Sequence, residues 1–401
     1  MAAILMISLV AGLGVGFGWF SGGGYSGPPV DYSQKPMEYS LEYPSKVVYS
    51  LDFTEPIEVI ALEAFTGEVT EQGEREAQFL RFTGDDFETL ATVSDHVPVA
   101  VSNTVGLVMD SDTKELKLIE FSSGDITPLG FDGEKDDYYL SNDVFLRHHG
   151  NTLTAYDLNK KKMWSKRVGD SIYGAYLLSG DAIVVNSEGF DILLDKSGGK
   201  EIMKINETGK WIDAIEDGYI IGTEREHDYF TMDGEKIGTV RGPWISSLDW
   251  RDYGIKDLYR QHKEGVTQLP SQTKRSSRAG TCMGTVINID SKAHIGDKTF
   301  DKIGDSYQWY ECSPDQRTAY ILDTDFDNES LTYYGFSQDS QAEPTISKQY
   351  KGVKVLPRTI YDYFRTVGVL EDESLIESDD SDYSTPTDVV DTLIIFGASN
   401  K

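Results

Sequence analysis

The chain has 401 residues, of which 39% are hydrophobic and 11% aromatic, and its net charge is −30 from 67 acidic and 37 basic residues. This composition supports a large folded core and excludes an intrinsically disordered chain. So acidic a surface repels phosphate groups, which argues against nucleic-acid binding and against attachment of the domain to anionic lipid. It attracts cationic peptides, basic proteins or divalent metal ions, although its simplest role is to keep the protein soluble.

The chain begins with a long apolar segment. Ala2–Phe20 carries no charge, and a helix of that length nearly spans a bilayer core of about 30 Å. We predict a transmembrane helix over residues 1–20, with a cleaved signal peptide as the alternative. The rest of the chain is then expected outside the cytoplasm, as part of a single-pass membrane protein in the first case and of a secreted protein in the second.

Two further divisions of the chain follow from composition. Residues 21–45 are rich in Gly, Pro, Ser and Tyr, which predicts a flexible linker without a core of its own. The folded domain is expected to span residues 46–401. Its abundance of Tyr and Phe favours β structure.

An internal repeat sets the architecture. Leu140–Leu146, Leu178–Val184 and Ile215–Ile221 each consist of a polar turn followed by an apolar strand, and they recur after 38 and 37 residues. Their apolar residues alternate with period two, unlike the pattern of helical repeats. Strand–turn–strand units at this period are typical of β-propeller blades.

Polar hairpin turns allow the blades to be counted. They lie near residues 67, 124, 160, 198, 234, 292 and 339. We therefore predict an all-β propeller of seven blades, with an eighth over residues 357–397 as the alternative. A strand from each end of the chain must close the ring, because otherwise both edges stay open. Val47–Phe53 and Thr392–Phe396 are the predicted closing strands.

One insertion interrupts the repeat, at residues 243–280. It is expected to form a short helix over Asp252–Lys263 and carries a local basic cluster in an acidic chain. Insertions on repeat scaffolds often map to the functional face, although an inert surface excursion is an equal alternative. The predicted partner-binding residues are Trp244, Trp250, Lys274, Arg275 and Arg278.

The sequence offers one candidate cross-link. Cys282 and Cys312 are the only cysteines, and outside the cytoplasm they are expected to form a disulfide, with two free thiols as the alternative. The bridge would join the end of the insertion to the next blade.

It also offers one candidate metal site. Asp323, Asp325 and Asp327 have the 1, 3, 5 spacing of calcium loops, but Asn328 and Tyr334 stand where an EF-hand has Gly and Glu. An acidic hairpin loop without metal is the predicted structure, and a calcium site is the alternative. No cofactor is predicted, and calcium is the one alternative.

A family resemblance rests on one hairpin. Ala155–Trp164, with the order Ala-Tyr-Asp, a polar turn, then Lys and Trp, resembles the repeat of quinoprotein-type (PQQ-like) β-propellers. The resemblance implies that Trp164 is structural and joins neighbouring blades. The quinone-dependent dehydrogenases of this group bear adjacent cysteines, which this chain lacks, so the resemblance is to the non-catalytic branch.

These observations together predict a membrane-tethered, extracytoplasmic propeller that binds a protein partner in or at the membrane, as a scaffold of the cell envelope or of a membrane complex. No catalytic residue is predicted. The alternative is an enzyme, either a degenerate quinoprotein oxidoreductase or another activity in the central channel.

Overall fold

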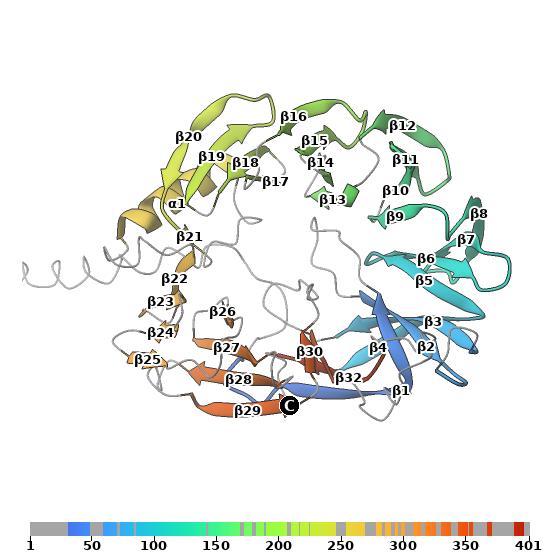
Figure 1. The fold of residues 1–401 in the computed structure, drawn as a ribbon, viewed down its shortest axis with the longest axis horizontal. Coiled ribbons are helices and arrows are strands. Elements are labelled where there is room, and N and C mark those ends of the chain that lie inside the picture. Colours follow the sequence, from blue (N-terminus) through green and yellow to red (C-terminus); the bar gives the residue numbers. More distant parts are fainter. Residues whose placement is uncertain are drawn as a thin grey trace, which may run out of the picture.

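The computed structural model describes a large part of the folded chain. The described residues are 31–48, 59–69, 73–83, 86–141, 143–168, 172–178, 182–187, 190–206, 210–215, 217–223, 225–245, 254–268, 278–282, 285–289, 293–295, 298–300, 308–313, 317–325, 330–337, 344–351, 353–355, 367–370 and 389–396. Within them the strands form small antiparallel sheets that follow one another around a ring (Figure 1). The protein is a β-propeller.

Six sheets of four or five strands are regular blades, numbered here in chain order. Blade 1 contains β5 (His96–Val101), β6 (Val105–Asp110), β7 (Glu115–Glu120) and β8 (Ile126–Asp132). Blade 2 contains β9 (Asp137–Leu140), β10 (Val144–His149), β11 (Thr152–Asp157) and β12 (Lys162–Arg167). Blade 3 contains β13 (Ile172–Leu178), β14 (Ala182–Ser187), β15 (Phe190–Asp195) and β16 (Glu201–Ile205).

The other three blades follow the same order. Blade 4 contains β17 (Trp211–Ile215), β18 (Gly218–Gly222), β19 (Glu226–Thr231) and β20 (Lys236–Arg241). Blade 5 contains β21 (Trp244–Ile245), β22 (Arg278–Cys282), β23 (Thr285–Ile289), β24 (Ala293–Ile295) and β25 (Lys298–Phe300). Blade 6 contains β26 (Gln308–Cys312), β27 (Thr318–Asp325), β28 (Ser330–Ser337) and β29 (Ile346–Lys351).

The two ends of the chain meet in a seven-stranded closing sheet of order β30-β31-β32-β1-β2-β3-β4. Its strands are β30 (Val353–Val355), β31 (Val367–Leu370), β32 (Val389–Ile395), β1 (Met37–Val48), β2 (Val59–Phe65), β3 (Arg75–Phe82) and β4 (Phe87–Ser94). β1 pairs with β32 on one side, where Met37 lies opposite Ile395, and with β2 on the other, where Val47 lies opposite Leu62. Strands from both ends of the chain therefore close the ring.

The prediction of seven blades is wrong: among the described residues there are six regular blades and one merged sheet. The turn near residue 67 joins β2 to β3, and their hairpin is merged with β30, β31 and β32 in the closing sheet, so it does not mark a regular blade of its own. The alternative of an eighth blade fails for the same reason, since β30, β31 and β32 belong to the closing sheet.

The predicted linker over residues 21–45 is wrong where the structure describes it. Met37–Val48 is a strand, and Tyr32 ahead of it is fully buried. The Tyr32 backbone N–H donates to Thr318 Oγ1 at 3.0 Å, and Tyr333 Oη donates to the Tyr32 carbonyl oxygen at 2.5 Å. The segment ahead of β1 is therefore fastened to blade 6.

The predicted single-pass membrane protein is also corrected. In the part of the chain that the structure describes, no helix has the length and apolar character needed to cross a bilayer. The segment Ala2–Phe20, on which the prediction depended, lies outside the described residues.

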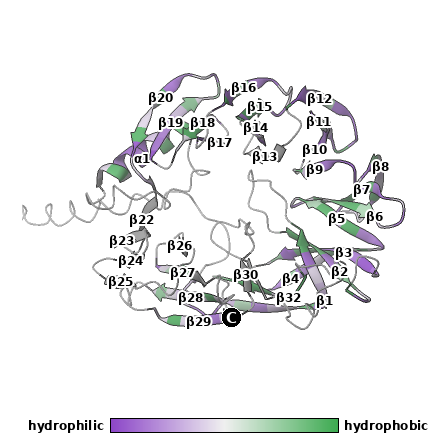
Figure 2. Ribbon diagram, viewed as in Figure 1, coloured by the Kyte–Doolittle hydropathy of each residue, from purple (hydrophilic) through white to green (hydrophobic). Residues whose placement is uncertain are grey.

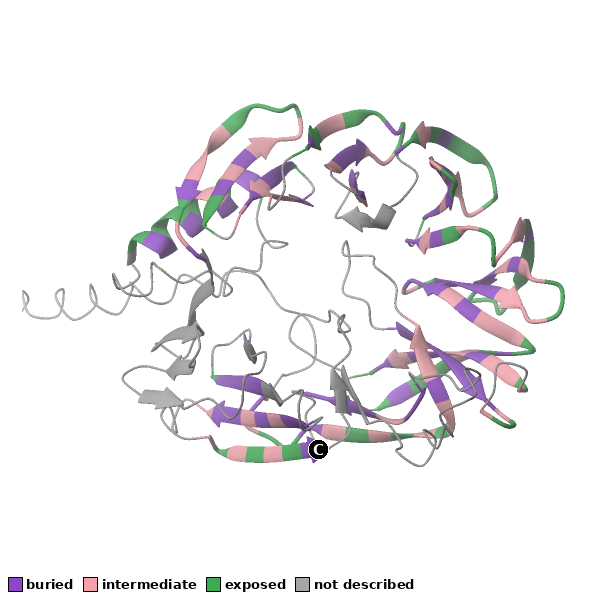
Figure 3. Cartoon of the chain, viewed as in Figure 1, coloured by how far each residue is buried: buried purple, intermediate pink, exposed green. Residues whose placement is uncertain are grey.

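The repeat corresponds to one blade. The apolar strands of the three segments that set the period become β10, β14 and β18, the second strands of blades 2, 3 and 4. These second strands are buried, whereas the fourth strands β12 and β16 carry exposed residues, as Figure 3 shows. Figure 2 shows the corresponding difference in hydropathy, with hydrophobic residues in the inner strands and hydrophilic residues in the fourth strands. Each blade thus buries its inner strands against its neighbours.

Antiparallel pairing gives the ring two faces. Connections from one blade to the next, and from second to third strands, lie on one face, here called the crossover face. Turns from third to fourth strands lie on the opposite face, here called the turn face. Four of these turns contain a left-handed residue, with φ of 74°, 65°, 64° and 86° at Gly124, Lys160, Gly199 and Gly234. Glycine adopts this conformation without strain, which explains its use at three of the four.

Candidate functional site

The insertion between blade 4 and the main part of blade 5 contains the one helix found in the described residues. This helix, α1, spans Ile255–Gln268, three residues later at its start than the predicted helix. It follows β21 and precedes β22, and it contacts β19, β20 and β21. Figure 1 shows α1 on the outer side of blade 4. The insertion is therefore seated on the propeller.

An apolar stripe holds α1 against blade 4. Ile255, Leu258 and Val266, at helical spacing, are buried against a cluster that includes Ile220 and Val240. Side chains three or four residues apart lie on one side of a helix, so this spacing makes one continuous apolar side.

The start of α1 is fixed by the turn between β17 and β18. The Ile255 backbone N–H donates to Asp217 Oδ1 at 2.8 Å, which satisfies one of the free donors at a helix N-terminus. Gly218 leaves room for this contact, because a Cβ there would lie 2.4 Å from the Phe230 carbonyl oxygen and 2.6 Å from Ile255. The helix therefore starts at one fixed place on blade 4.

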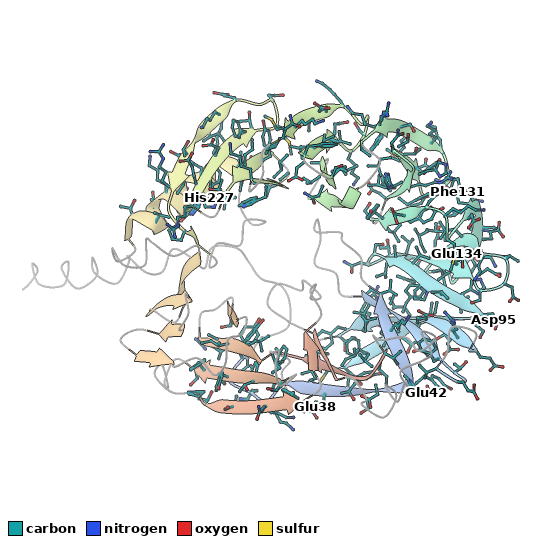
Figure 4. The ribbon with its side chains drawn as sticks, viewed as in Figure 1. Glu38, Glu42, Asp95, Phe131, Glu134 and His227 are labelled. Carbon is teal, nitrogen blue, oxygen red and sulfur yellow. The ribbon has the colours of Figure 1, made fainter. Side chains whose placement is uncertain are left out.

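A second set of contacts, buried and polar, seats the middle of α1. Tyr229 Oη and His262 Nδ1 are 2.5 Å apart, and His262 Nε2 lies 3.0 Å from the Pro243 carbonyl oxygen. A carbonyl oxygen only accepts, so Nε2 carries the proton and Nδ1 accepts from the tyrosine hydroxyl. The His227 ring lies edge-on to His262 at 5.0 Å, with Trp211 at 5.8 Å from His227. Figure 4 labels His227 on the side of blade 4 near α1.

Burial keeps both histidines neutral. It lowers the pKa of His262 to about 4, even though the hydrogen bond to Pro243 works in the opposite direction. Burial also lowers the pKa of His227 to about 4, with a smaller contribution from nearby His262. A charged imidazole at either position would lose the solvation of water. Trp211, His227, Tyr229 and His262 together form a seat for α1.

The outer side of α1 is polar and exposed. Its charged residues are Lys256, Asp257, Arg260, Lys263 and Glu264, all exposed. Arg260 pairs with Asp257 at 2.9 Å, and both side chains are more than half exposed. Lys263 Nζ donates to Tyr259 Oη at 3.3 Å and lies 5.5 Å from the centre of that ring.

A second polar cluster lies on the crossover face between blades 1 and 2. Arg147 Nε and His149 Nδ1 each lie 2.5 Å from a different oxygen of Asp136, whose side chain is fully buried. Burial alone raises the pKa of Asp136, but the hydrogen bonds from His149 and Arg147 outweigh it and hold the pKa below its usual value. The Arg147 guanidinium also lies over the Phe131 ring at 4.7 Å. Both carboxylate oxygens of Asp136 have a partner, so this cluster has a structural role that links blades 1 and 2.

Trp164 lies at the junction of blades 2 and 3. Its Nε1 donates to the Lys196 carbonyl oxygen at 2.6 Å, in the turn between β15 and β16. A Cβ at Gly199 would lie 2.6 Å from the indole, so the ring packs directly on that glycine. Trp164 therefore joins one blade to the next.

The structure describes only some of the predicted partner-binding residues. Trp244 in β21 lies opposite Arg278 in β22, in the parallel pair that brackets the insertion. Trp250, Lys274 and Arg275 lie outside the described residues.

The structure describes part of the alternative calcium site. Asp323 and Asp325 belong to β27, opposite Thr332 and Ser330 of β28, whereas Asp327 is outside the described residues. The two aspartates are therefore in a strand instead of the expected loop. No group of three or more metal-ligating side chains occurs in the described part of the chain.

The predicted disulfide is not supported. Cys282 ends β22 of blade 5, and Cys312 ends β26 of blade 6. The side chains of both cysteines lie outside the described part of the structure, so the bridge stays a prediction.

Sequence reasoning missed the seat and the outer side of α1. Ile255, Leu258, His262 and Val266 follow a helical spacing, and this signal was available to place His262 on the buried side. Its partner Tyr229 is 33 residues away, and no local pattern links the two.

The comparisons with known proteins concern the fold. No family model matches the chain, and no curated protein matches it. A eukaryotic initiation factor shares 10% identity and a TM-score of 0.42, with 84% of each chain covered. The WD40 domain of SCAP from fission yeast shares 8% identity and a TM-score of 0.41, with 91% of this chain and 98% of that chain covered. Hsv2 from Kluyveromyces lactis shares 11% identity and a TM-score of 0.38, with 77% of this chain and 99% of that chain covered. Likenesses this distant carry no conclusion about what the chain binds.

Proposed function

We propose that the protein is a binding module that holds a protein partner on the outer side of α1. The observation that carries the proposal is the division of this helix into two sides. Its inner side is fixed to blade 4 by an apolar stripe and by the bonds of His262, whereas its outer side presents five exposed charged residues to solvent. An insertion seated this firmly offers a preformed surface, which lowers the entropic cost of association.

The location of α1 supports the same function. Helices and loops added to a repeat scaffold often carry its interactions, because the scaffold holds them in place while their outer residues vary freely. The other polar cluster described, around Asp136, is satisfied internally by Arg147 and His149. The outer side of α1 is the better candidate for contact with another protein.

Affinity capture of the full-length chain from the cells that produce it tests this function. The comparison is between the wild type, a Lys256→Ala/Lys263→Ala variant and a Lys161→Ala/Lys162→Ala control. The control lysines are exposed and lie at the turn face, Lys161 in the turn between β11 and β12 and Lys162 at the start of β12. We expect a partner that is retained by the wild type and the control and lost from the α1 variant. A partner retained equally by all three, or none captured at all, contradicts the proposal.

A further inference from the structure

The insertion differs from the rest of the chain in charge. Residues 243–280 contain seven of the 37 basic residues and only four of the 67 acidic ones. The surrounding protein is strongly negative, so an anionic ligand is repelled from most of its surface and is attracted only where basic side chains dominate.

Three basic side chains form a line along α1. Lys256, Arg260 and Lys263 are exposed and stand at positions i, i+4 and i+7, which share one side of a helix. At about 1.5 Å rise per residue, neighbouring members of this basic stripe are about 6 Å and about 4.5 Å apart along the axis.

Local pairing leaves this basic stripe available. Lys256 has no hydrogen bond or ion pair within the described residues. The pair between Arg260 and Asp257 is exposed, and such surface pairs are worth at most about 1 kcal/mol, so a new carboxylate can replace Asp257. Lys263 lies over the Tyr259 ring, which holds its ammonium group on the helix surface.

We infer that the basic stripe of Lys256, Arg260 and Lys263 binds an extended, acidic segment of the protein partner. Side chains two residues apart on an extended chain point to the same side and are about 6.6 Å apart. Alternate carboxylates are therefore spaced close to the interval between Lys256 and Arg260, and the long side chain of Lys263 spans the remaining difference of about 2 Å. This inference rests on the proposed function and adds the chemistry of the partner.

A nucleic acid is the less favoured ligand. Each nucleotide adds a phosphate charge, and a long polyanion extends beyond the stripe onto the acidic blades, where it is repelled. A short acidic peptide places its charges on α1 alone. An oligonucleotide of equal charge is therefore included in the test.

The experiment measures binding of a labelled peptide of about eight residues with alternating Glu and Ser to the full-length protein, by fluorescence anisotropy. We expect Lys256→Glu/Lys263→Glu to weaken binding by about tenfold or more, because two weak attractions become repulsions. The control Lys161→Glu/Lys162→Glu makes the same change in net charge on the turn face and should change the affinity by less than about twofold. Circular dichroism verifies that both variants are folded.

Other outcomes overturn the inference. They are equal loss in both variants, no binding to the wild type, or tighter binding of the oligonucleotide than of the peptide. If capture finds a partner through α1 while the acidic peptide does not bind, the proposed function stands and this inference fails. Peptide binding at the stripe with no captured partner supports the inference and contradicts the proposed function.

Discussion

A sheet face packs against another blade at the junction of blades 2 and 3, and against a helix at the junction of blade 4 and α1. Between blades 2 and 3 the cover is another blade, and the buried cluster includes Leu146, Trp164 and Val185. In this junction the indole of Trp164 donates a hydrogen bond to the carbonyl oxygen of Lys196, in the turn between β15 and β16. Between blade 4 and α1 the cover is a helix, and the buried set includes Tyr229 and His262, joined by a hydrogen bond.

The difference has a geometric cause. Two blades with the same strand spacing match each other with apolar side chains alone, because their alternation is the same on both sides. A helix repeats every 3.6 residues and cannot follow that alternation, so directional hydrogen bonds help to fix its position. We therefore expect the blade junction to depend on volume and the helix junction on hydrogen bonds and protonation.

The largest expected effect is at the blade junction. Trp164→Ala should lower the free energy of unfolding by about 3–5 kcal/mol, because a buried indole is replaced by a cavity. Trp164→Phe keeps most of the volume and loses the bond to Lys196, so it should cost clearly less. Urea unfolding of both variants separates the contribution of indole packing from that of the hydrogen bond to Lys196. Equal losses in the two variants would mean that the bond outweighs the packing.

The helix junction should respond to pH. The pKa of His227 and of His262 is lowered to about 4 in the folded protein from an unfolded value of 6.5. The unfolded chain therefore binds more protons between these values, and stability is fully present above pH 6.5 and lost as the pH falls toward 4. The expected loss is on the order of 3 kcal/mol for each of the two histidines.

Urea unfolding at several pH values measures this loss. The variant His262→Gln carries no titrating group at that position and should show roughly half of the pH dependence. If the unfolding free energy of His262→Gln falls with pH as steeply as that of the wild type, protonation of His262 does not cause the pH dependence.

Within blade 4, two buried tyrosines separate hydrogen bonding from packing. Tyr229→Phe leaves His262 Nδ1 buried without its donor and should cost about 1–3 kcal/mol. Tyr219, on the neighbouring strand, is equally buried, and its hydroxyl has no hydrogen-bond partner in the described structure. Tyr219→Phe should therefore leave the unfolding free energy unchanged or raise it. Similar losses in the two variants would remove the special role given to the Tyr229–His262 bond.

The smallest effect should be on the outer side of α1. Lys256→Glu/Lys263→Glu changes only exposed side chains, and its effect on the unfolding free energy should stay within about 0.5 kcal/mol. The same variant is expected to lose partner binding. Thermal unfolding would reveal a structural role for these lysines if the midpoint fell markedly.

Several features of the fold followed from local patterns. The alternating segment that became β10 and its copies predicted a blade, and polar turns such as Asp233-Gly234 marked hairpins that the structure contains. The helix in the insertion was predicted close to Ile255–Gln268. These features depend on neighbouring residues, whose spacing is visible in the chain.

The blade count and the candidate site depended on contacts between distant residues. β1 and β32 share a sheet although more than 300 residues separate Met37 from Ile395, so composition alone suggested a linker where a strand forms. The bond between Tyr229 and His262 likewise joins a strand of one blade to an inserted helix. The amino-acid sequence by itself determined the repeating unit, because alternation and turn chemistry are local. Tertiary structure decided how the ring closes and which side of α1 is exposed, because both depend on which surfaces meet after folding.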